Sequence, residues 1–279
     1  MSEAVDYIVV GAGSAGCVLA NRLSANGKHT VCLLEAGPPD RSPWIHIPIG
    51  YGKTMFHKVL NWGYYTEPDP NMLNRRIYWP RGRTLGGSSA INGLIYIRGQ
   101  RRDYDAWAAA GNPGWSWDDC LPYFRKLENN DLGPGPTRGT EGPLNATSIK
   151  TPHPLVEGLI GAAGALGLPH VRDFNSGDQE GVGYYQLTTR NGRRCSTAVA
   201  YLRPAQGRAN LRVETDAHAM GILFEGTRAC GVRYRRDGQV RTLRARREVI
   251  LCAGALQSPQ LLQLSGVGPA ALLRQFGIR

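Results

Sequence analysis

Two short apolar runs, at residues 7–10 and 31–34, dominate the first part of the chain. Unbroken apolar runs of this length are typical of strands that are buried on both faces, as in a parallel sheet. Between the two runs, apolar residues recur at helical spacing and predict a helix that begins at Ser14 and packs on the sheet. Its apolar stripe consists of Ala15, Val18, Leu19 and Leu23.

The middle of the chain carries a weaker pattern. Helices are predicted at residues 118–127 and 153–166, and the Gly/Pro-rich stretch between them, residues 131–151, is expected to be a loop. Another helix is expected after Ser196 or Thr197, either of which can serve as its N-cap.

The last part of the chain is mainly strand-like. Asp237 and Gly238 are typical hairpin-turn residues between strand-like runs, and a second fully buried strand, residues 248–253, precedes a helix at residues 260–264. Ser258 is predicted to cap that helix, with Pro259 as its first residue. The other strand-like runs, predicted to form an antiparallel meander, are residues 211–213, 218–224, 230–235 and 240–245.

A G-x-G-x-x-G pattern connects the first strand to the first helix. Gly11 permits the tight turn, and Gly13 lets a phosphate approach the backbone. Gly16 lets the helix lie close to the strand. Ser14 and Ala15 open the helix, whose N-terminal N–H groups and partial positive charge stabilise a pyrophosphate.

Glu35 and Ala36 follow the second apolar run. A carboxylate at this place can accept hydrogen bonds from both hydroxyls of an adenosine ribose, and it would repel a 2′-phosphate. The strand, helix and acid together favour dinucleotide binding over a purely structural Gly-rich turn. The motif does not separate FAD from NAD.

Helical and strand periodicity fail between residues 38 and 74, where prolines and aromatic residues are frequent. A long excursion packed by its own aromatic side chains is expected there. Such an excursion can be a lid, a partner contact or a surface meander, and the sequence leaves these alternatives open.

Residues 80–99 are rich in glycine and small hydroxyl residues. Gly86 and Gly87, followed by Ser88, give a backbone that can press flat against a ring or a phosphate. Asn92 would lie one helical turn beyond Ser88, where its amide could hold a phosphate or ribityl oxygen. These features suit a flavin better than a nicotinamide. Judged from its residues alone, however, the stretch favours an ordinary Gly/Ser-rich loop over a functional one.

Composition narrows the function classes. With 42% hydrophobic and 20% charged residues the protein is globular, and it has no apolar run long enough for a transmembrane segment. The net charge of +11 raises the possibility of nucleic-acid binding, but the basic residues are scattered, which argues for no nucleic-acid partner. Six cysteines without paired spacing predict neither a metal site nor disulfides. Without a signal peptide we expect a cytoplasmic protein, with peripheral attachment at the inner membrane left open.

Three stretches, residues 6–37, 81–99 and 254–268, resemble in order the FAD-binding opening and the two signatures of the glucose–methanol–choline (GMC) oxidoreductase family, FAD-dependent oxidases and dehydrogenases of alcohols. The resemblance covers essentially the whole chain. Residues 79–98 and 103–107 look most like the bacterial choline and aliphatic alcohol dehydrogenases, which pass electrons to a carrier rather than to oxygen. The resemblance also implies cofactor-binding roles for Arg83, Gly93, Ala253 and Gly254, and for the backbone of Ala219 near the adenine.

The fold implied is α/β: a Rossmann-like FAD-binding domain with a parallel sheet and an inserted antiparallel β-meander, plus part of a substrate domain. Residues 1–147, including the excursion 38–74, would be the first part of the FAD-binding domain. Residues 148–191 would be a partial substrate-domain segment, and residues 192–279 the second part of the FAD-binding domain.

The activity implied is oxidation of a primary alcohol or choline-like substrate to an aldehyde, with hydride passing to flavin N5. The electrons would go to an acceptor other than NAD, such as a quinone or a carrier protein. The family's catalytic histidine lies beyond its second signature, so this chain looks like an N-terminal fragment and no catalytic residue is assigned. A noncatalytic, truncated FAD-binding module and an NAD-dependent dehydrogenase remain the alternatives.

Covalent attachment of the flavin is not expected. Some family members tether it through a histidine directly before the Asn92 position, where this chain has Ile91, which carries no nucleophile. The resemblance therefore implies noncovalent FAD.

Overall fold

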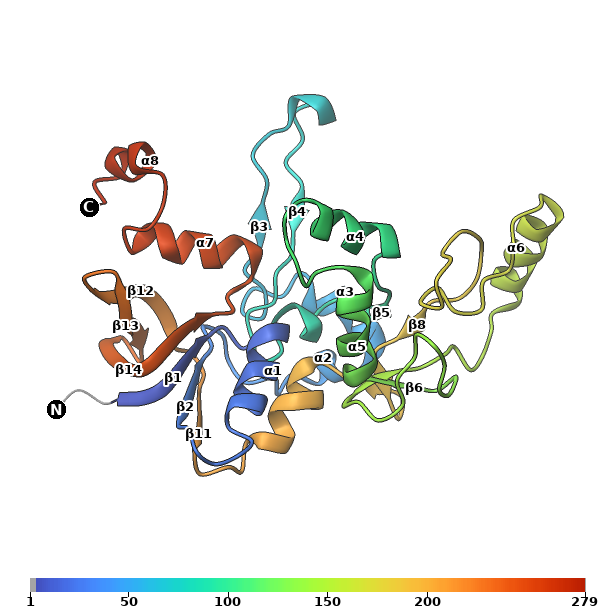
Figure 1. The fold of residues 1–279 in the computed structure, drawn as a ribbon. Helices are drawn as coiled ribbons and strands as arrows, with labels where there is room; N and C mark the ends of the chain where they lie inside the picture. The colour runs from blue at the N-terminus through green and yellow to red at the C-terminus, as the bar shows by residue number, and fades with distance from the viewer. Residues whose placement is uncertain (1–3, 279) are drawn as a thin grey trace. The chain divides into compact units, whose positions relative to one another are not determined.

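The computed structural model describes residues 4–278 of the chain (Figure 1). Two compact units are present, one formed by Met1–Asn92 with Ser196–Arg279 and the other by Gly93–Cys195. These units follow backbone proximity, whereas the boundaries at residues 147 and 191 rest on the family resemblance and stay a prediction. Among residues 4–278, no helix combines the length and apolar composition needed to cross a bilayer.

The first unit is built on a six-stranded sheet with the order β11-β2-β1-β14-β13-β12. Four neighbouring strands, β11, β2, β1 and β14, run parallel, and β13 and β12 continue the same sheet in antiparallel fashion. The expected α/β class with a parallel sheet and an antiparallel meander is confirmed, but the run at residues 211–213, predicted to belong to the meander, pairs in parallel with β2 instead. The strands are β1 (Ala4–Val10), β2 (Val31–Leu34), β11 (Leu211–Glu214), β12 (His218–Glu225), β13 (Arg228–Arg236) and β14 (Gln239–Leu251).

Strand β14 corrects the prediction of two separate strands in this region. It is one continuous strand whose first part pairs with β13 and whose second part pairs with β1. The charged residues Arg246 and Arg247, which break the apolar pattern, lie where the register shifts, between the pairs Val5–Ala245 and Tyr7–Glu248. A bulge of this kind accommodates extra residues without ending the strand.

Helix α1 (Ser14–Leu23) begins where predicted, but the predicted apolar stripe is not its most buried face, since Val18, Leu19 and Leu23 are only partly buried. Ala15 is exposed, and the fully buried positions are small or polar: Gly16, Cys17, Ala20 and Asn21. The helix lies so close to the strand that a methyl group on Gly16 would be 1.9 Å from the carbonyl oxygen of Gly11. Only small side chains fit at that separation.

The excursion predicted to be irregular contains short helices and an antiparallel arm. Strands β3 (Tyr64–Tyr65) and β4 (Tyr78–Trp79) pair at the base of the arm, and Ile45 and Leu60 pack with Ala90 and Ile91 in a small separate core. The helices of the excursion are α2 (Pro43–His46), η1 (Pro48–Gly50), α3 (Tyr51–Thr54) and η2 (Pro70–Met72), and η3 (Gly87–Ala90) follows the arm.

Of two predicted helix starts, one differs from the structure and the other is confirmed with Ser196 as the cap. Helix α7 (Gly254–Leu264) begins at Gly254, with Ala253 as its N-cap, so Pro259 lies inside the helix rather than at its first turn. After residue 196 the chain forms a short π-helix, η4 (Ala198–Leu202), without a side-chain bond from its N-cap Thr197. The Ser196 hydroxyl does accept a hydrogen bond from the Val199 N–H (3.3 Å). The first unit also contains η5 (Arg203–Ala205), and its last helix is α8 (Ala270–Gln275).

The second unit contains the two predicted middle helices, as α5 (Trp117–Leu127) and α6 (Pro154–Ala165). The stretch predicted to be a loop between them includes a strand that pairs in parallel with β6. At the centre of the unit the Arg98 guanidinium forms a fully buried ion pair with Glu128 at 2.6 Å. The remaining elements are α4 (Arg101–Ala109), β5 (Ile95–Tyr96), β6 (Glu128–Asn130), β7 (Leu144–Ala146), β8 (Gln186–Leu187), β9 (Thr189–Arg190) and β10 (Arg193–Arg194).

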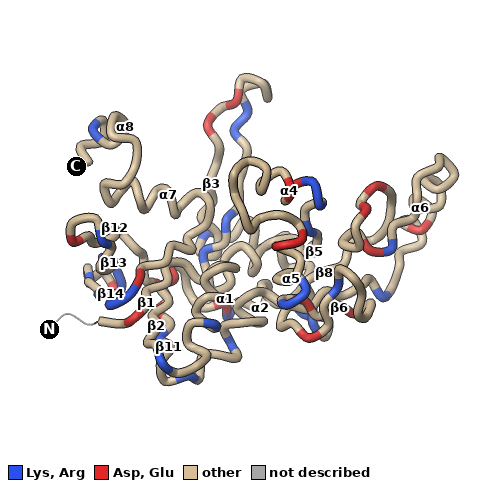
Figure 2. The backbone as a smooth tube through the Cα atoms, viewed as in Figure 1, with Lys and Arg blue, Asp and Glu red and all other residues tan. Residues whose placement is uncertain are grey.

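Basic residues are distributed along both units rather than gathered on one element (Figure 2). Several arginines of the first unit face acidic partners, including Arg246 with Asp6 and Arg244 with Glu225. Such pairs are typical of a solvated surface.

Candidate functional site

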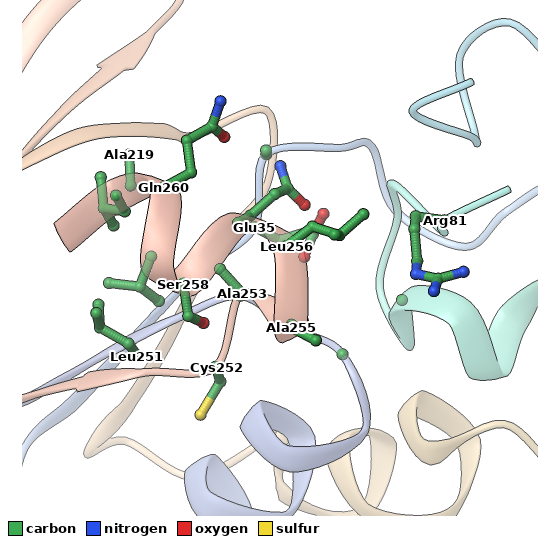
Figure 3. Close-up of a pocket in the computed structure, with 18 of the residues that line it drawn as sticks. Glu35, Arg81, Ala219, Leu251, Cys252, Ala253, Ala255, Leu256, Ser258 and Gln260 are labelled. Atoms are coloured by element: carbon green, nitrogen blue, oxygen red, sulfur yellow. The ribbon is translucent and has the colours of Figure 1, made fainter. Parts of the chain in front are cut away.

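A cavity of about 650 Å³ lies in the first unit, where β1, β2 and β14 end. Its volume is in the range that accommodates a small molecule or a cofactor. In an open parallel sheet, ligands bind outside the carboxyl ends of the strands, which is where this cavity lies. Figure 3 shows Glu35 close to the first turns of α7, with Arg81 on a separate segment.

The three glycines of the first turn have different surroundings. A methyl group on Gly11, where φ is +100°, would lie 2.5 Å from the carbonyl oxygen of Cys252. Gly16 is equally confined against the Gly11 carbonyl. At Gly13, by contrast, the nearest atom to an added methyl group would be 3.9 Å away, and the residue faces the cavity. Gly11 and Gly16 are therefore required by the fold, whereas Gly13 leaves space for a ligand.

Glu35 faces the glycine turn and is almost fully buried. Its Oε2 accepts a hydrogen bond from the Ala12 N–H and its Oε1 from the Gly37 N–H, each at 2.9 Å. Burial raises the pKa of Glu35 to about 7, an effect that outweighs these two hydrogen bonds and the nearby Arg83 charge. Each carboxylate oxygen retains a further lone pair, so the group can accept ligand hydroxyls as well.

The second glycine-rich stretch packs directly on the first. The Gly86 N–H donates to the Ala12 carbonyl (2.7 Å), and a methyl group on Gly87, where φ is +53°, would lie 2.7 Å from Cα of Gly13. Ser88, the next residue, lines the cavity. Two segments far apart in sequence thus form a continuous floor with little side-chain cover.

Hydroxyl groups hold this floor in place. The Ser89 Oγ donates to the Gly86 carbonyl (2.6 Å) and accepts from the Thr197 N–H (3.0 Å). The Thr197 hydroxyl lies 2.9 Å from the same oxygen. The chain segment that re-enters the first unit at residue 196 therefore supports the glycine floor from behind.

Most of the sequence-predicted residues border the cavity. Those that line it are Gly11, Gly13, Ser14, Ala15, Glu35, Ala36, Gly87, Ser88, Ala219, Ala253 and Gly254. The others are not among its lining residues: Gly16, Arg83, Gly86, Asn92 and Gly93. Gly16 and Gly86 make the backbone contacts described above. The cofactor-binding roles predicted for all five residues stay predictions.

Asn92 and Gly93 lie where the chain passes from the first compact unit to the second. The Asn92 N–H bonds the Ser88 carbonyl at 2.9 Å, which gives the helical turn that was predicted. Gly93 is the first residue of the second compact unit.

Arg83 does not line the cavity. Its guanidinium lies over the ring of Trp62, 5.1 Å from the ring centroid, and its Nη2 donates to the Ala36 carbonyl at 3.5 Å. Trp62 does line the cavity, together with Arg81 and Gly82. Sequence reasoning missed Trp62 because it lies in the aromatic excursion, where nothing in the local pattern indicates what the ring faces.

The wall formed by α7 was also missed. Leu256, Ser258 and Gln260 line the cavity because the helix begins at Gly254, five residues before the predicted first residue Pro259. Figure 3 shows them along the first turns of α7. Cys252, predicted to be a core residue, is only half-buried and lines the cavity too.

His218, the first residue of β12, lines the cavity as well. Burial and the neighbouring Arg235 and Arg83 charges lower the pKa of His218. Within residues 4–278, no three His, Cys, Asp or Glu side chains converge in a way that could hold a metal ion.

Known proteins resemble the chain along its length. A model of the GMC oxidoreductase family matches residues 5–275. The chain is 49% identical over 279 residues to the mitochondrial choline dehydrogenase of Mus musculus, a match that covers 98% of this chain and 47% of that protein. It is 47% identical over 277 residues to the alcohol dehydrogenase (acceptor) of Pseudomonas putida, covering 98% of this chain and 50% of that protein.

Solved structures agree with the fold. Pyridoxine 4-oxidase from Mesorbium loti matches with a TM-score of 0.94 and 36% identity over 98% of this chain and 54% of that chain. An FAD-dependent oxidoreductase from Chaetomium thermophilum matches with a TM-score of 0.90 and 33% identity over 99% of this chain and 50% of that chain. The chain spans about half the length of the relatives it matches. Because the family model covers nearly all of its residues, the chain belongs to the GMC oxidoreductase family.

Proposed function

We propose that this chain binds FAD noncovalently as the cofactor part of an oxidoreductase that acts on CH–OH groups. The substrate class is a primary alcohol or a choline-like compound, which is oxidised to an aldehyde. Electrons then pass to an acceptor other than NAD, a quinone or a carrier protein. The names of the relatives, choline dehydrogenase and acceptor-dependent alcohol dehydrogenase, support this class.

One observation carries the proposal: Gly13, Glu35 and Gly87 converge on one cavity. At Gly13 an added methyl group would meet no atom closer than 3.9 Å, which leaves room for a pyrophosphate at the N-terminus of α1. Glu35 offers a buried carboxylate to ribose hydroxyls. Gly87 and Ser88 provide the bare backbone that a flavin ring would require.

In the proposed reaction the residues of this chain bind and orient the cofactor. The α1 N–H groups stabilise the phosphates, and Glu35 fixes the sugar. Bound FAD supplies a hydride acceptor at its N5 atom. We further propose that residues 1–147 and 192–279 serve the cofactor and that residues 148–191 contribute to the substrate domain.

A noncatalytic FAD-binding module is the second candidate. His218 is the one histidine, among residues 4–278, that lines the cavity, and it lies edge-on against Trp62 with ring centroids 5.7 Å apart. A histidine in that setting supports an aromatic wall rather than a catalytic base, so this chain offers no assigned proton acceptor for an alcohol.

A titration tests the proposal and separates its alternatives. The purified chain is titrated with FAD and with NAD⁺. A protein of the relatives' full length that contains this sequence is then loaded with FAD and mixed with choline or a primary alcohol under anaerobic conditions. We expect stoichiometric FAD binding and no comparable NAD⁺ binding. Bleaching of bound flavin by an alcohol supports the oxidoreductase, and bound flavin that no alcohol bleaches supports the noncatalytic module. Preference for NAD⁺ over FAD would contradict both.

A further inference from the structure

Exposed apolar side chains are concentrated in one part of the excursion, on and next to α2, η1 and α3. Ile49 is 79% exposed and Phe56 is 65% exposed. The three short helices contact one another, so their exposed side chains belong to one surface, which we call the excursion patch. Its apolar members are Trp44, Ile47, Ile49, Tyr51, Phe56 and Val59. Apolar residues gathered in this way mark a surface that a partner covers.

The charges along this part of the chain are positive. Arg41, Lys53 and Lys58 are exposed, and no residue from 41 to 66 is acidic. Asp40, which precedes the patch, is buried and forms an ion pair with Arg203 at 2.8 Å. Its charge therefore does not offset the exposed cations, and charge complementarity calls for an anionic partner.

The residue types of the patch suit the surface of a lipid bilayer. Trp and Tyr are enriched where a bilayer meets water, because each combines an apolar ring with one polar group. The Lys53 ammonium lies over the Trp44 ring, 3.9 Å from its centroid, so a cation and an aromatic ring are presented together. Proteins that lie on anionic membranes insert apolar side chains below the headgroups and bind the headgroups with Lys and Arg.

We infer that the excursion patch is a contact surface for a bilayer that contains anionic phospholipids. Ile49, Tyr51 and Phe56 enter the headgroup region, and Lys53 and Lys58 bind the lipid phosphates. The contact is peripheral, because no helix among residues 4–278 could span the bilayer. The inference goes beyond the proposed function, since binding to lipid requires neither FAD nor an alcohol.

Helix α6 provides a matched comparison, because it is exposed and apolar but lacks cations. Leu155 is 78% exposed and Leu159 is 65% exposed, close to the values of Ile49 and Phe56. Glu157 is the one charged residue within α6, and the sequence has neither Lys nor Arg from residue 151 to residue 171. Exposed apolar side chains can therefore be tested with and without positive charge beside them.

Co-sedimentation with lipid vesicles tests the inference. One set of vesicles is phosphatidylcholine alone, and the other is an equal mixture of phosphatidylcholine and phosphatidylglycerol. The chain and the full-length protein that contains it should both bind the mixed vesicles more tightly. Lys53→Gln with Lys58→Gln should weaken that binding by roughly 10- to 30-fold, since each cation near an anionic surface contributes about fivefold.

The apolar contribution is tested by Ile49→Ser with Phe56→Ser, which should weaken binding to the mixed vesicles at least about tenfold. Leu155→Ser with Leu159→Ser is the control and should bind like wild type. Thermal melts confirm that each variant is folded. Should the Ile49 and Phe56 variant not fold, the lysine variant, which changes exposed charges alone, decides the test.

Several results would overturn the inference. These are absence of vesicle binding, equal binding to both lipid compositions, wild-type binding by the lysine variant, or an equal loss in the α6 control. Binding by the chain but not by the full-length protein would show that the rest of that protein covers the patch. A dimer that Ile49→Ser with Phe56→Ser converts to a monomer would assign the patch to a second copy, and this too would overturn the inference. FAD titration of the same samples tests the proposed function separately.

Discussion

Gly87 lies so close to Gly13 that a methyl group on the former would be 2.7 Å from Cα of the latter. The contact joins the two glycine-rich stretches backbone to backbone and creates the floor of the cavity. The two glycines are needed for different reasons: Gly87 has no space for a side chain within the protein, and Gly13 borders the space left for a ligand.

Replacing Gly87 by alanine should destabilise the protein. The residue has φ of +53° and faces backbone at 2.7 Å, so the substitution combines strain with overpacking and should cost about 2 to 4 kcal/mol. Urea unfolding measures the loss. Gly52→Ala is the control, since Gly52 lies in α3 with open space around it, and it should be neutral or slightly stabilising. Equal stability of the two variants would contradict the packing described.

Glu35 should make the ligand-free protein less stable as pH rises. Its pKa is raised from 4.5 to about 7 in the fold, so between these values the folded state holds a proton that the unfolded state has released. The stability contributed by this proton is complete below about pH 4.5 and lost by about pH 7, a difference on the order of 3 kcal/mol. Unfolding curves at several pH values check this, and Glu35→Gln should remove that part of the pH dependence. A wild-type curve that stays flat across this range would contradict the assignment.

Ligand binding should show the complementary dependence. Ribose hydroxyls donate to a carboxylate and favour its charged form, so binding should lower the pKa of Glu35 and release a proton. ADP affinity is then expected to rise with pH up to about 7 and to level off above it. Calorimetry in buffers of different ionisation enthalpy measures the released proton directly. In Glu35→Gln the release should disappear, and its persistence would assign the proton to another group.

The first strand–helix–strand unit was predictable because its determinants are local. Glycine spacing, two apolar runs and the acid at residue 35 each act within a few neighbouring residues. Even there the predicted buried face of α1 was wrong. The helix approaches the strand so closely at Gly16 that small residues such as Ala20 are buried in place of the larger ones in the periodic stripe.

Features that depend on distant partners were not predictable. Trp62 becomes a cavity wall only through Arg83, Tyr64 and His218, which the sequence does not place beside it. The Ser258–Pro259 pair has the composition of a helix start, yet the chain has already turned helical at Gly254. Pro259 lies inside α7 without ending the helix. Local residue propensity alone does not indicate that the helix starts before this proline.

The buried ion pair of the second unit should be essential to its stability. Arg98 and Glu128 have side-chain exposures of 2% and 0%, so Arg98→Met leaves an uncompensated carboxylate and should cost roughly 3 to 5 kcal/mol. The double variant Arg98→Met with Glu128→Leu should recover part of the loss. The exposed pair Arg101–Asp118 is the control, and Arg101→Ala should cost less than about 1 kcal/mol. Similar losses at the two pairs would contradict the role given to burial.

Flavin should be released from the protein by acid. Ile91, next to Asn92, is buried and has no nucleophilic atom that could form a bond to the ring. After reconstitution with FAD and precipitation with trichloroacetic acid, the absorbance near the flavin bands should be found in the supernatant. A yellow pellet that keeps its colour after washing would show a covalent link and contradict noncovalent binding.

The central claim is that Gly13 is kept bare for the phosphates of FAD, and calorimetric titration of wild type and Gly13→Ala with FAD tests it most directly. The nearest atom to the added methyl group is 3.9 Å away, so the variant should melt like wild type while binding FAD at least about tenfold more weakly. Wild type should bind one FAD per chain. Unchanged FAD affinity in a folded Gly13→Ala variant, or no FAD binding by wild type, would contradict the account.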